Sequence, residues 1–406
     1  MKTFDIPAFY RSPIIGKIKE LRKTSDPRKK DFSPVTIDFG TIQFVIPRHF
    51  GFCYGVENAI EISYKALADN PDKRIFLLSQ MIHNPEVNAD LQAHGINFIM
   101  DTEGKHFIDW DELKSDDIVI IPAFGTTLEI ENILKEKNIE TAKYNTTCPF
   151  VERVWNRAEK LGKEDYTIII HGKHSHEETR ATFSHSKNNA PSIVIKDMKE
   201  ALILGDIILE KKTTEEFYEI FNNKYSTNFN IEKDLLRIGV INQTTMLASE
   251  TQAIADFLKN VMIKKYGEAN VKNHFADTRD TLCYATNDNQ TSTLALMNID
   301  ADIAIVIGGY NSSNTTHLVE ILEEKFPVYF INNENNISDS GKIEHYNIHA
   351  KQTKNNSVFD DNKPHKVIIT SGASCPDSVL EKVIQKIISF YPQALPIEKV
   401  LENIKL

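Results

Sequence analysis

Four cysteines are the residues of this 406-residue chain that most need a chemical explanation. They are Cys53, Cys148, Cys283 and Cys375, and they stand far apart along the sequence. No two form a CxxC pair, so their spacing gives no support to a zinc-ribbon or thioredoxin-like site. A reducing compartment does not favour disulfides between such distant positions. Three or four isolated thiols can still meet in space.

Cys148 lies where the sequence predicts the beginning of a helix. Pro149 suits the first helical position, and the hydrophobic residues that follow recur on one helical face: Val151, Val154, Trp155, Ala158 and Leu161. The unpaired N–H groups and the positive end of the helix dipole favour an anion there, so we expect Cys148 to ionise more easily than a free cysteine. A thiolate would serve as a metal ligand or a nucleophile. The alternative is a buried, inert cysteine.

Two loops carry short polar side chains where a strand meets a helix. They read YNSSNTT at 310–316 and TSGAS at 370–374. Backbone N–H groups, the helix dipole and short side-chain donors converge on phosphate oxygens in such loops. Together they predict an anion site, although ordinary N-capping by Ser or Asn would explain either loop alone.

The stretch HGKHSHEET at 171–179 concentrates three histidines and two glutamates. Histidine exchanges protons near neutral pH, and a glutamate whose pKa is raised by burial or by a nearby anion can act as a general acid. Zinc is the competing explanation, but the HExxH pattern is missing. His83 and residues 243–245 also follow β-rich runs. Taken alone, His83 is better explained as a hydrogen-bonded structural histidine.

These residues fall in the loops of one repeated unit, which consists of a β-rich run, a short polar loop and an amphipathic helix. Clear examples are TIQFVIPRHFGFCYGVENAI, ADIAIVIGGYNSSNTTHLVEIL and KVIITSGASCPDSVLEKVI. The alternation predicts α/β domains with parallel sheets, in which ligands bind at the carboxyl ends of the strands. Two polar stretches, 209–234 and 350–365, are interpreted as insertions without chemistry.

The composition predicts a soluble, cytoplasmic protein of two or three domains. Hydrophobic residues make up 41% of the chain, and the formal net charge is −10. That charge argues against bulk binding of nucleic acid but allows a local basic pocket. No apolar run approaches the roughly 20 residues that span a bilayer, and the N-terminus lacks the order of a signal peptide, so we expect no membrane partner.

Residues 1–40 contain many basic residues and little sustained periodicity. We interpret them as a solvated arm or as an edge packed on the first domain. The alternative is a docking surface for an acidic partner.

Eight ordered motifs resemble those of the 4-hydroxy-3-methylbut-2-enyl diphosphate reductase family, over roughly residues 41–390. That family catalyses the last step of the non-mevalonate isoprenoid pathway. The motifs are GFCYGV with Cys53, IHN with His83, TTCP with Cys148, HEE at 176–178, NQTT at 242–245, LCYAT with Cys283, NSSN at 311–314 and SGAS at 371–374.

The resemblance implies three α/β domains with mainly parallel sheets, arranged as a pseudo-threefold cloverleaf around a central [4Fe–4S] cluster. Cys53, Cys148 and Cys283 match the ligands, and one iron would stay open for the substrate. The implied segments are an N-terminal extension (1–40), three domains that carry Cys53, Cys148 and Cys283 in turn (41–146, 147–281, 282–380) and a C-terminal helix and tail (381–406).

The resemblance also implies the reductive dehydroxylation of 4-hydroxy-3-methylbut-2-enyl diphosphate to isopentenyl and dimethylallyl diphosphate. The electrons would come from an external ferredoxin- or flavodoxin-type donor. Glu178 matches the proton donor, and Thr244 matches its hydrogen-bonding partner. The residues that match diphosphate contacts are His83, His176, Ser312, Ser313, Asn314 and Ser374.

Two positions depart from the family pattern. Many bacterial members have a histidine in an AHG loop that contacts the diphosphate, whereas this chain has Phe124 in PAFG, which places it nearer the plant and cyanobacterial branch. Cys375 stands where members usually have a small or hydroxyl residue, and we interpret it as a bystander near the pocket. Two other functions stay open. One is a non-redox [4Fe–4S] hydro-lyase acting on a small anionic metabolite, and the other is a binding or sensor protein with a structural cluster or zinc.

Overall fold

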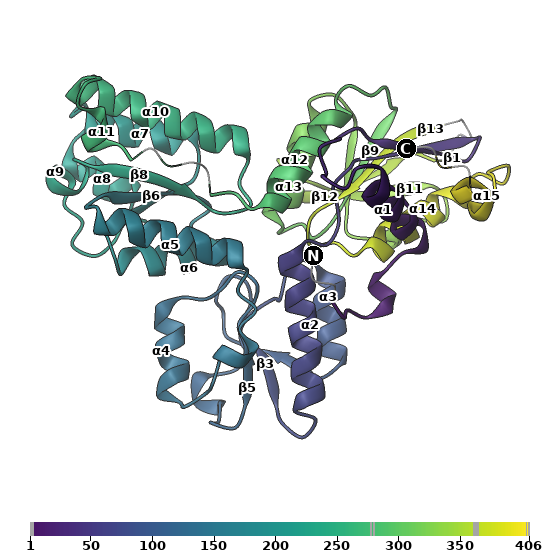
Figure 1. Cartoon of the computed structure of the whole chain (residues 1–406), viewed down its shortest axis with the longest axis horizontal. Coiled ribbons are helices and arrows are strands. Elements are labelled where there is room, and N and C mark those ends of the chain that lie inside the picture. The colour runs from purple at the N-terminus through teal and green to yellow at the C-terminus, as the bar shows by residue number, and fades with distance from the viewer. Residues whose placement is uncertain (1–3, 277, 279–280, 360–364, 403, 405–406) are drawn as a thin grey trace. The chain divides into compact units, whose positions relative to one another are not determined.

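The computed structural model describes residues 4–276, 278, 281–359, 365–402 and 404. Parts of the predicted insertion 350–365 and of the predicted terminal segments therefore lie outside the described residues. The chain forms two compact units. Figure 1 shows the helices and strands along the chain. Unit 1 comprises Met1–Glu61, Ile82–Ala89 and Tyr284–Leu406, and unit 2 comprises Ile62–Met81 and Asp90–Cys283.

The strands divide cleanly between the units. Those of unit 1 are β1 (Val35–Asp38), β2 (Ile42–Ile46), β9 (Ile303–Ile307), β10 (Val328–Ile331), β11 (Lys342–Asn347), β12 (Gln352–Ser357) and β13 (His365–Ser371). Those of unit 2 are β3 (Ile75–Leu77), β4 (Ile96–Phe98), β5 (Ile118–Ile120), β6 (Thr167–His171), β7 (Ser192–Ile195) and β8 (Ile238–Asn242).

The helices follow the same division, except that α2 (Tyr54–Asp69) and α3 (Pro85–Ala93) begin in unit 1 and end in unit 2. Unit 1 contains η1 (Ala8–Tyr10), α1 (Pro13–Ser25), α12 (Tyr284–Leu296), α13 (Ser313–Glu323), η4 (Glu334–Asn336), α14 (Asp377–Ile388) and α15 (Ile397–Glu402). Unit 2 contains η2 (Trp110–Glu112), α4 (Leu128–Glu136), η3 (Ala142–Tyr144), α5 (Pro149–Lys163), α6 (Glu177–Lys187), α7 (Met198–Ile208), α8 (Thr214–Ile220), α9 (Ile231–Asp234), α10 (Ala248–Tyr266) and α11 (Val271–His274).

Unit 1 is built on a five-stranded sheet in the order β1-β2-β13-β9-β10. Its pairs are parallel except for β1 with β2. Alternate residues of β9 enter different cores: Ile305 packs with residues of α1 and α14, and Val306 packs with residues of α13. Because helices cover both faces of the sheet, β9 is hydrophobic throughout.

Unit 2 contains two three-stranded parallel sheets, β4-β3-β5 and β7-β6-β8. In β6, Ile169 packs against residues of α7 and α10, while Ile168 and Ile170 pack against residues of α5. The mixed α/β fold with mainly parallel sheets that the sequence predicts is therefore confirmed. The three-domain boundaries stay a prediction, and β2, from the predicted first domain, pairs with β13 from the predicted third.

Two predicted peripheral segments contribute to the cores. Residues 209–234 form α8 and α9 and bury Phe217, Phe221 and Phe229 against residues of α7 and α10. The description of this stretch as polar is therefore incomplete, because three of its aromatic residues belong to the core. Its interpretation as an insertion without chemistry stays a prediction. In the N-terminal segment, α1 buries isoleucines in the main core and β1 is the edge strand of the sheet. Of the two forms that we expected for residues 1–40, these elements agree with an edge packed on a domain and not with a solvated arm.

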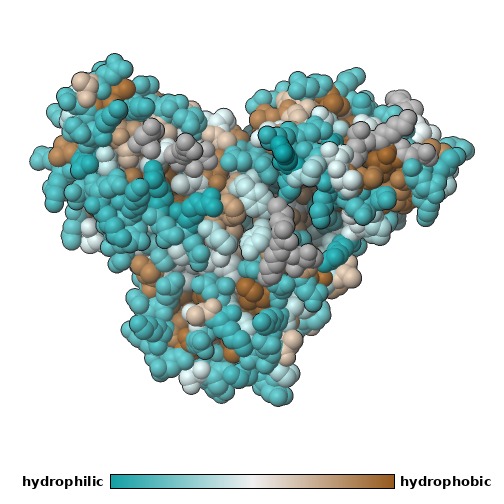
Figure 2. Space-filling model, in the orientation of Figure 1, coloured by the Kyte–Doolittle hydropathy of each residue, from teal (hydrophilic) through white to brown (hydrophobic). Residues whose placement is uncertain are grey.

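The visible surface is mostly hydrophilic, with hydrophobic residues in small groups (Figure 2). In the described ranges, no helix combines the length and the apolar character that crossing a bilayer requires.

Candidate active site

Three of the four cysteines directly precede a helix. Cys53 precedes α2, Cys148 precedes α5 and Cys283 precedes α12. All three are partly exposed, whereas Cys375 is completely buried, and none of the four forms a disulfide. The N-terminal turn of a helix presents N–H groups that stabilise an anion. The three partly exposed cysteines therefore share a position at the beginning of a helix, where N–H groups can interact with a thiolate.

Cys148 is the N-cap of α5, with Pro149 at the first helical position, so the predicted helix start is confirmed. Burial raises the pKa of Cys148 to about 11; the N–H groups of Phe150 and Val151 lower it, and Cys283 and Glu178 raise it further. The expectation that Cys148 ionises more easily than a free cysteine is therefore wrong. Burial outweighs the helix end, and a metal that displaces the proton would remove this cost.

Glu178 is a buried carboxyl group in the first turn of α6, only 1% exposed. The Thr244 backbone N–H donates to its Oε1 at 2.5 Å, and the Thr244 hydroxyl donates to its Oε2 at 2.9 Å. Burial raises the pKa of Glu178 to about 7, although both bonds from Thr244 lower it. Glu178 is thus poised to hold or release a proton near neutral pH, as a general acid must.

Thr244 links this acid to Cys283. The backbone N–H of Cys283 donates to the carbonyl of Thr244 at 3.2 Å. The same loop is tied to the end of β8, because the N–H of Thr281 donates to the Asn242 side chain at 2.8 Å. Unit 2 therefore brings Glu178, Thr244 and two of the predicted cluster ligands into one neighbourhood.

Gln243, which the sequence placed with Thr244 at the end of a β-rich run but without a role, is a structural residue of this neighbourhood. Its Oε1 accepts the hydroxyl of Thr179 at 2.9 Å and the N–H of Lys173 at 3.3 Å, and its Nε2 donates to Thr245 at 2.7 Å. It thereby joins the loop before α6 to the loop after β8. The NQTT motif places Gln243 beside Thr244, but no sequence pattern indicates which loop its side chain reaches.

Unit 1 gathers five of the predicted anion-binding residues: His83, Ser312, Ser313, Asn314 and Ser374. Ser312 caps α13 by accepting the N–H of Thr315. The Ser374 hydroxyl donates to the carbonyl of His83 at 3.1 Å. Asn314 is 4% exposed, and both polar atoms of its side chain lack a partner within the described residues. An unpaired buried amide is costly unless a ligand satisfies it, so Asn314 fits the predicted anion site.

Glycines let these loops approach one another closely. A Cβ on Gly309 would lie 2.5 Å from the carbonyl oxygen of His83, and one on Gly372 would lie 2.0 Å from the hydroxyl oxygen of Thr315. Thr315, which we did not predict, also donates its hydroxyl to Ser312 at 2.9 Å. The YNSSNTT run contains this threonine, but only the fold shows that it lies against Gly372 of the second predicted anion loop.

His176 lies in unit 2, as the N-cap of α6, and its Nδ1 accepts the N–H of Glu178 at 3.2 Å. The ring of Phe124 packs edge-on against the His176 ring, with centroids 5.8 Å apart and planes at 82°. A phenyl ring offers no hydrogen bond to a diphosphate. Phe124 therefore supports His176 instead of supplying the contact that a histidine would make.

The described ranges contain no ready-made group of three or more His, Cys, Asp or Glu side chains placed to hold a metal. Cys148 and Cys283 belong to unit 2 and Cys53 belongs to unit 1.

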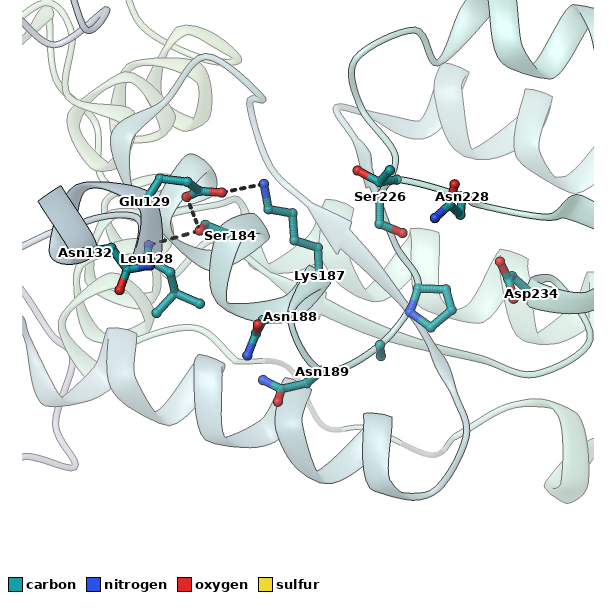
Figure 3. Close-up of a pocket in the computed structure, with 13 residues that line it drawn as sticks. Leu128, Glu129, Asn132, Ser184, Lys187, Asn188, Asn189, Ser226, Asn228 and Asp234 are labelled. Carbon is teal, nitrogen blue, oxygen red and sulfur yellow. Dashed lines mark hydrogen bonds and ion pairs between the residues drawn. The ribbon is translucent and has the colours of Figure 1, made fainter.

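A polar hollow of about 560 Å³ lies elsewhere in unit 2, and none of the predicted site residues lines it (Figure 3). There Lys187 reaches Glu129 at 2.7 Å, and Ser184 donates to the same carboxylate at 2.6 Å. Burial alone would raise the pKa of Glu129, but these two partners lower it to about 2. The hollow thus contains an ion pair at the surface, and neither Glu178 nor the cysteines of the candidate active site line it.

Comparisons with known proteins agree with the motifs. The family described as "LytB protein" matches residues 44–388. A 4-hydroxy-3-methylbut-2-enyl diphosphate reductase from Crocosphaera subtropica is 40% identical over 382 residues, which cover 93% of this chain and 89% of that one. A protein of the same name from Microcystis aeruginosa is 38% identical over 392 residues, which cover 95% and 91%. Both organisms are cyanobacteria, as the Phe124 loop predicts.

A solved structure shows the same fold. It is described as the E-1-hydroxy-2-methyl-but-2-enyl-4-diphosphate reductase from Plasmodium falciparum, and it matches with a TM-score of 0.59 at 23% identity, covering 83% of this chain and 85% of that one. Since the family match spans most of the sequence, the chain belongs to the LytB protein family.

Proposed function

We propose that this protein reduces 4-hydroxy-3-methylbut-2-enyl diphosphate to isopentenyl and dimethylallyl diphosphate, the last step of the non-mevalonate isoprenoid pathway. Membership of the LytB protein family supports the proposal. The structural observation that carries it is the buried Glu178 carboxyl group, which accepts hydrogen bonds from the backbone N–H and the hydroxyl of Thr244. The carbonyl of Thr244 in turn accepts the backbone N–H of Cys283. A proton donor is thereby fixed beside a predicted metal ligand.

The cofactor of the proposal is a [4Fe–4S] cluster held by Cys53, Cys148 and Cys283. The donor set fits, because iron–sulfur clusters are held by thiolates and these three cysteines are the partly exposed ones, each directly before a helix. When bound, the cluster would accept electrons from an external ferredoxin- or flavodoxin-type donor and offer one open iron to the substrate hydroxyl. The proposal includes three α/β domains, 41–146, 147–281 and 282–380, around that cluster.

The substrate diphosphate would bind the loops of unit 1. Ser312, Asn314 and Ser374 supply uncharged donors near the beginnings of α13 and α14, where N–H groups and the helix dipole favour an anion. His83 and Ser313 complete this group, and His176 is the contact proposed from unit 2. Because Phe124 replaces a histidine, we assign the diphosphate one direct contact fewer than in many bacterial members.

The proposed reaction consumes two electrons and two protons. The allylic C–O bond breaks, the hydroxyl leaves as water, and the other proton adds to one or the other end of the allylic carbon system. Glu178 holds a proton at its carboxyl group and supplies it during the reaction, while Thr244 fixes the orientation of that group. The negative diphosphate would favour the protonated form of Glu178 further.

The test is turnover by protein that has been purified without oxygen and loaded with iron and sulfide. With a reduced dye as donor, we expect the substrate to give both isopentenyl and dimethylallyl diphosphate. Loss or addition of water by the substrate without any reductant, to give a product other than these two, would instead support a hydro-lyase. Diphosphate binding without product would indicate a non-catalytic protein and would contradict the proposal.

A further inference from the structure

A cluster of exposed basic side chains lies on unit 1, at the beginning of the chain. We call it the N-terminal basic patch; its members are Arg11, Lys17, Lys23, Arg28, Lys29 and Lys30. The patch is notable because the chain as a whole has a formal net charge of −10. A local positive surface on an acidic protein attracts a partner of opposite charge.

Two carboxylates near the patch form ion pairs with buried arginines and not with residues of the patch. Arg22 binds Asp31 at 3.0 Å, and Arg48 binds Asp26 at 3.6 Å. The side chains of these arginines are 5% and 7% exposed. Glu20 is the remaining acid on α1. Glu20 lies three residues from both Lys17 and Lys23 on α1. Arg11 also acts on Glu57, and Lys29 acts on Asp288. The six basic side chains of the patch outnumber these acids, so the patch keeps a net positive charge.

The patch lies beside the loop that carries Cys53. Lys19 of α1 binds Asp377 at 2.8 Å, and its Nζ lies 3.3 Å from where a Cβ of Gly51 would stand. A hollow of about 400 Å³ is lined by Lys19 and Lys23 together with Phe52, the residue before Cys53. The same hollow contains the carboxyl groups of Glu57 and Asp377, so it is not uniformly positive.

The positive charge reaches the loop itself. The pKa of His49, four residues before Cys53, is lowered to about 4, first by burial and then by Arg48 and Lys29, with Lys19 acting in the same direction and Asp26 opposing. Burial is the main cause of this shift, and the smaller effects show that Arg48, Lys29 and Lys19 lie close enough to act on the loop.

We propose that the N-terminal basic patch is the docking surface for the protein that delivers electrons, and that this partner is a small, acidic one-electron carrier. Its negative surface would face Lys17, Lys23 and Lys30, and its redox centre would face Phe52 and the Cys53 loop. Each turnover would need two docking events, because the reaction takes two electrons. The inference rests on the proposed function and adds the place where the donor binds.

Two matched charge-reversal variants test the docking surface. The first combines Lys17→Glu, Lys23→Glu and Lys30→Glu, and the second combines Lys160→Glu, Lys199→Glu and Lys264→Glu, which are exposed lysines of unit 2. Both change the net charge equally. The probe is an oxidised, acidic [2Fe–2S] ferredoxin, titrated by calorimetry into the cluster-loaded protein at low and at high salt.

We expect the first variant to bind the ferredoxin at least about 10-fold more weakly than the parent at low salt, because charge complementarity of this kind changes association by 10-fold or more. The second variant should bind within about 2-fold of the parent, and salt should weaken binding most for the parent and the second variant. Equal binding by both variants, or an equal loss in both, would overturn the proposal. So would tight binding of a short DNA duplex at the patch without any binding of ferredoxin.

Turnover separates this inference from the proposed function. With ferredoxin as donor, the first variant should lose kcat/KM in parallel with affinity, while with a saturating reduced dye it should match the parent. If the parent itself makes no product with the dye, the proposed function is wrong, and the binding titration still decides the docking surface.

Discussion

The candidate site residues of the two units differ in kind: those compared in unit 1 are uncharged, whereas those compared in unit 2 are ionisable groups whose pKa is shifted by burial. In unit 1, Ser312, Asn314 and Ser374 are uncharged donors on loops that glycines bring close together. In unit 2, burial raises the pKa of both Cys148 and Glu178. Neutral donors can hold an anion without a protonation change, whereas a buried acid can move a proton at neutral pH. On the proposed function, the loops of unit 1 would bind most of the diphosphate, and Glu178 of unit 2 would supply the proton. Cys53 of unit 1 and His176 of unit 2 are the proposed exceptions to this division.

The largest expected effect separates the cysteines that precede helices from the completely buried one. Replacing Cys53, Cys148 or Cys283 by Ser should remove the cluster or degrade it badly, because thiolates are the ligands that iron–sulfur clusters prefer. Cys375→Ser is the control and should keep iron near the parent level. Iron and sulfide analysis measures the outcome, and cluster loss in the Cys375 variant alone would reverse the assignment.

The next effect concerns the anion loops of unit 1. Ser374→Ala and Asn314→Ala should each weaken binding of the product diphosphate by about 10- to 100-fold, because a hydrogen bond to a charged group contributes about 1.5–3 kcal/mol. The cluster spectrum should not change. Ser338→Ala, on the exposed surface of the same unit, is the matched control. If both loop variants bind product as tightly as the control does, the substrate site lies elsewhere.

The pH dependence of kcat/KM would test the role of Glu178 in unit 2. Because burial raises the pKa of Glu178 to about 7, a rate that depends on its proton should be full below pH 7 and fall above it. The fall should be about tenfold per pH unit, and it should appear in kcat/KM, which reports the free enzyme. A profile that stays flat to pH 9 with a reduced dye as donor would contradict the assignment.

Thr244→Ala should have the smallest effect of the series. It removes one donor to Glu178, while the backbone N–H of residue 244 stays in place. Both bonds lower the pKa of Glu178, so losing the hydroxyl should move the alkaline limb of the profile to higher pH. The rate should fall by less than the roughly 100-fold that removing a general acid costs. A limb that moves to lower pH would show that the hydroxyl acts otherwise.

Local sequence patterns predicted the elements that carry the site. The apolar spacing after Cys148 and the proline at its first position indicated α5, and the hydroxyl-rich run at 311–316 indicated the beginning of α13. These signals lie within a few residues of the groups they position. Family resemblance then supplied the roles of Glu178 and Thr244, and their hydrogen bonds are consistent with those roles.

Features that depend on distant parts of the chain were not predictable in the same way. Central strands such as β6 and β9 are buried along their whole length, so they carry little information about strand order. The pairing of β2 with β13 joins opposite ends of the chain. The pKa of Cys148 was mispredicted because burial is set by the whole fold and not by the helix that follows. Gln243 and Thr315 act through residues far away in sequence or through backbone contacts that only the fold shows.

The most direct test of the division between binding and chemistry is one variant measured in two ways. Glu178→Gln keeps the shape of the side chain but cannot deliver a proton. At iron content matched to the parent, its kcat with a reduced dye should fall by at least about 100-fold, while its affinity for product diphosphate should stay within about 3-fold. A Glu178→Gln variant that turns over within a few-fold of the parent, or that loses product affinity instead of rate, would contradict the account.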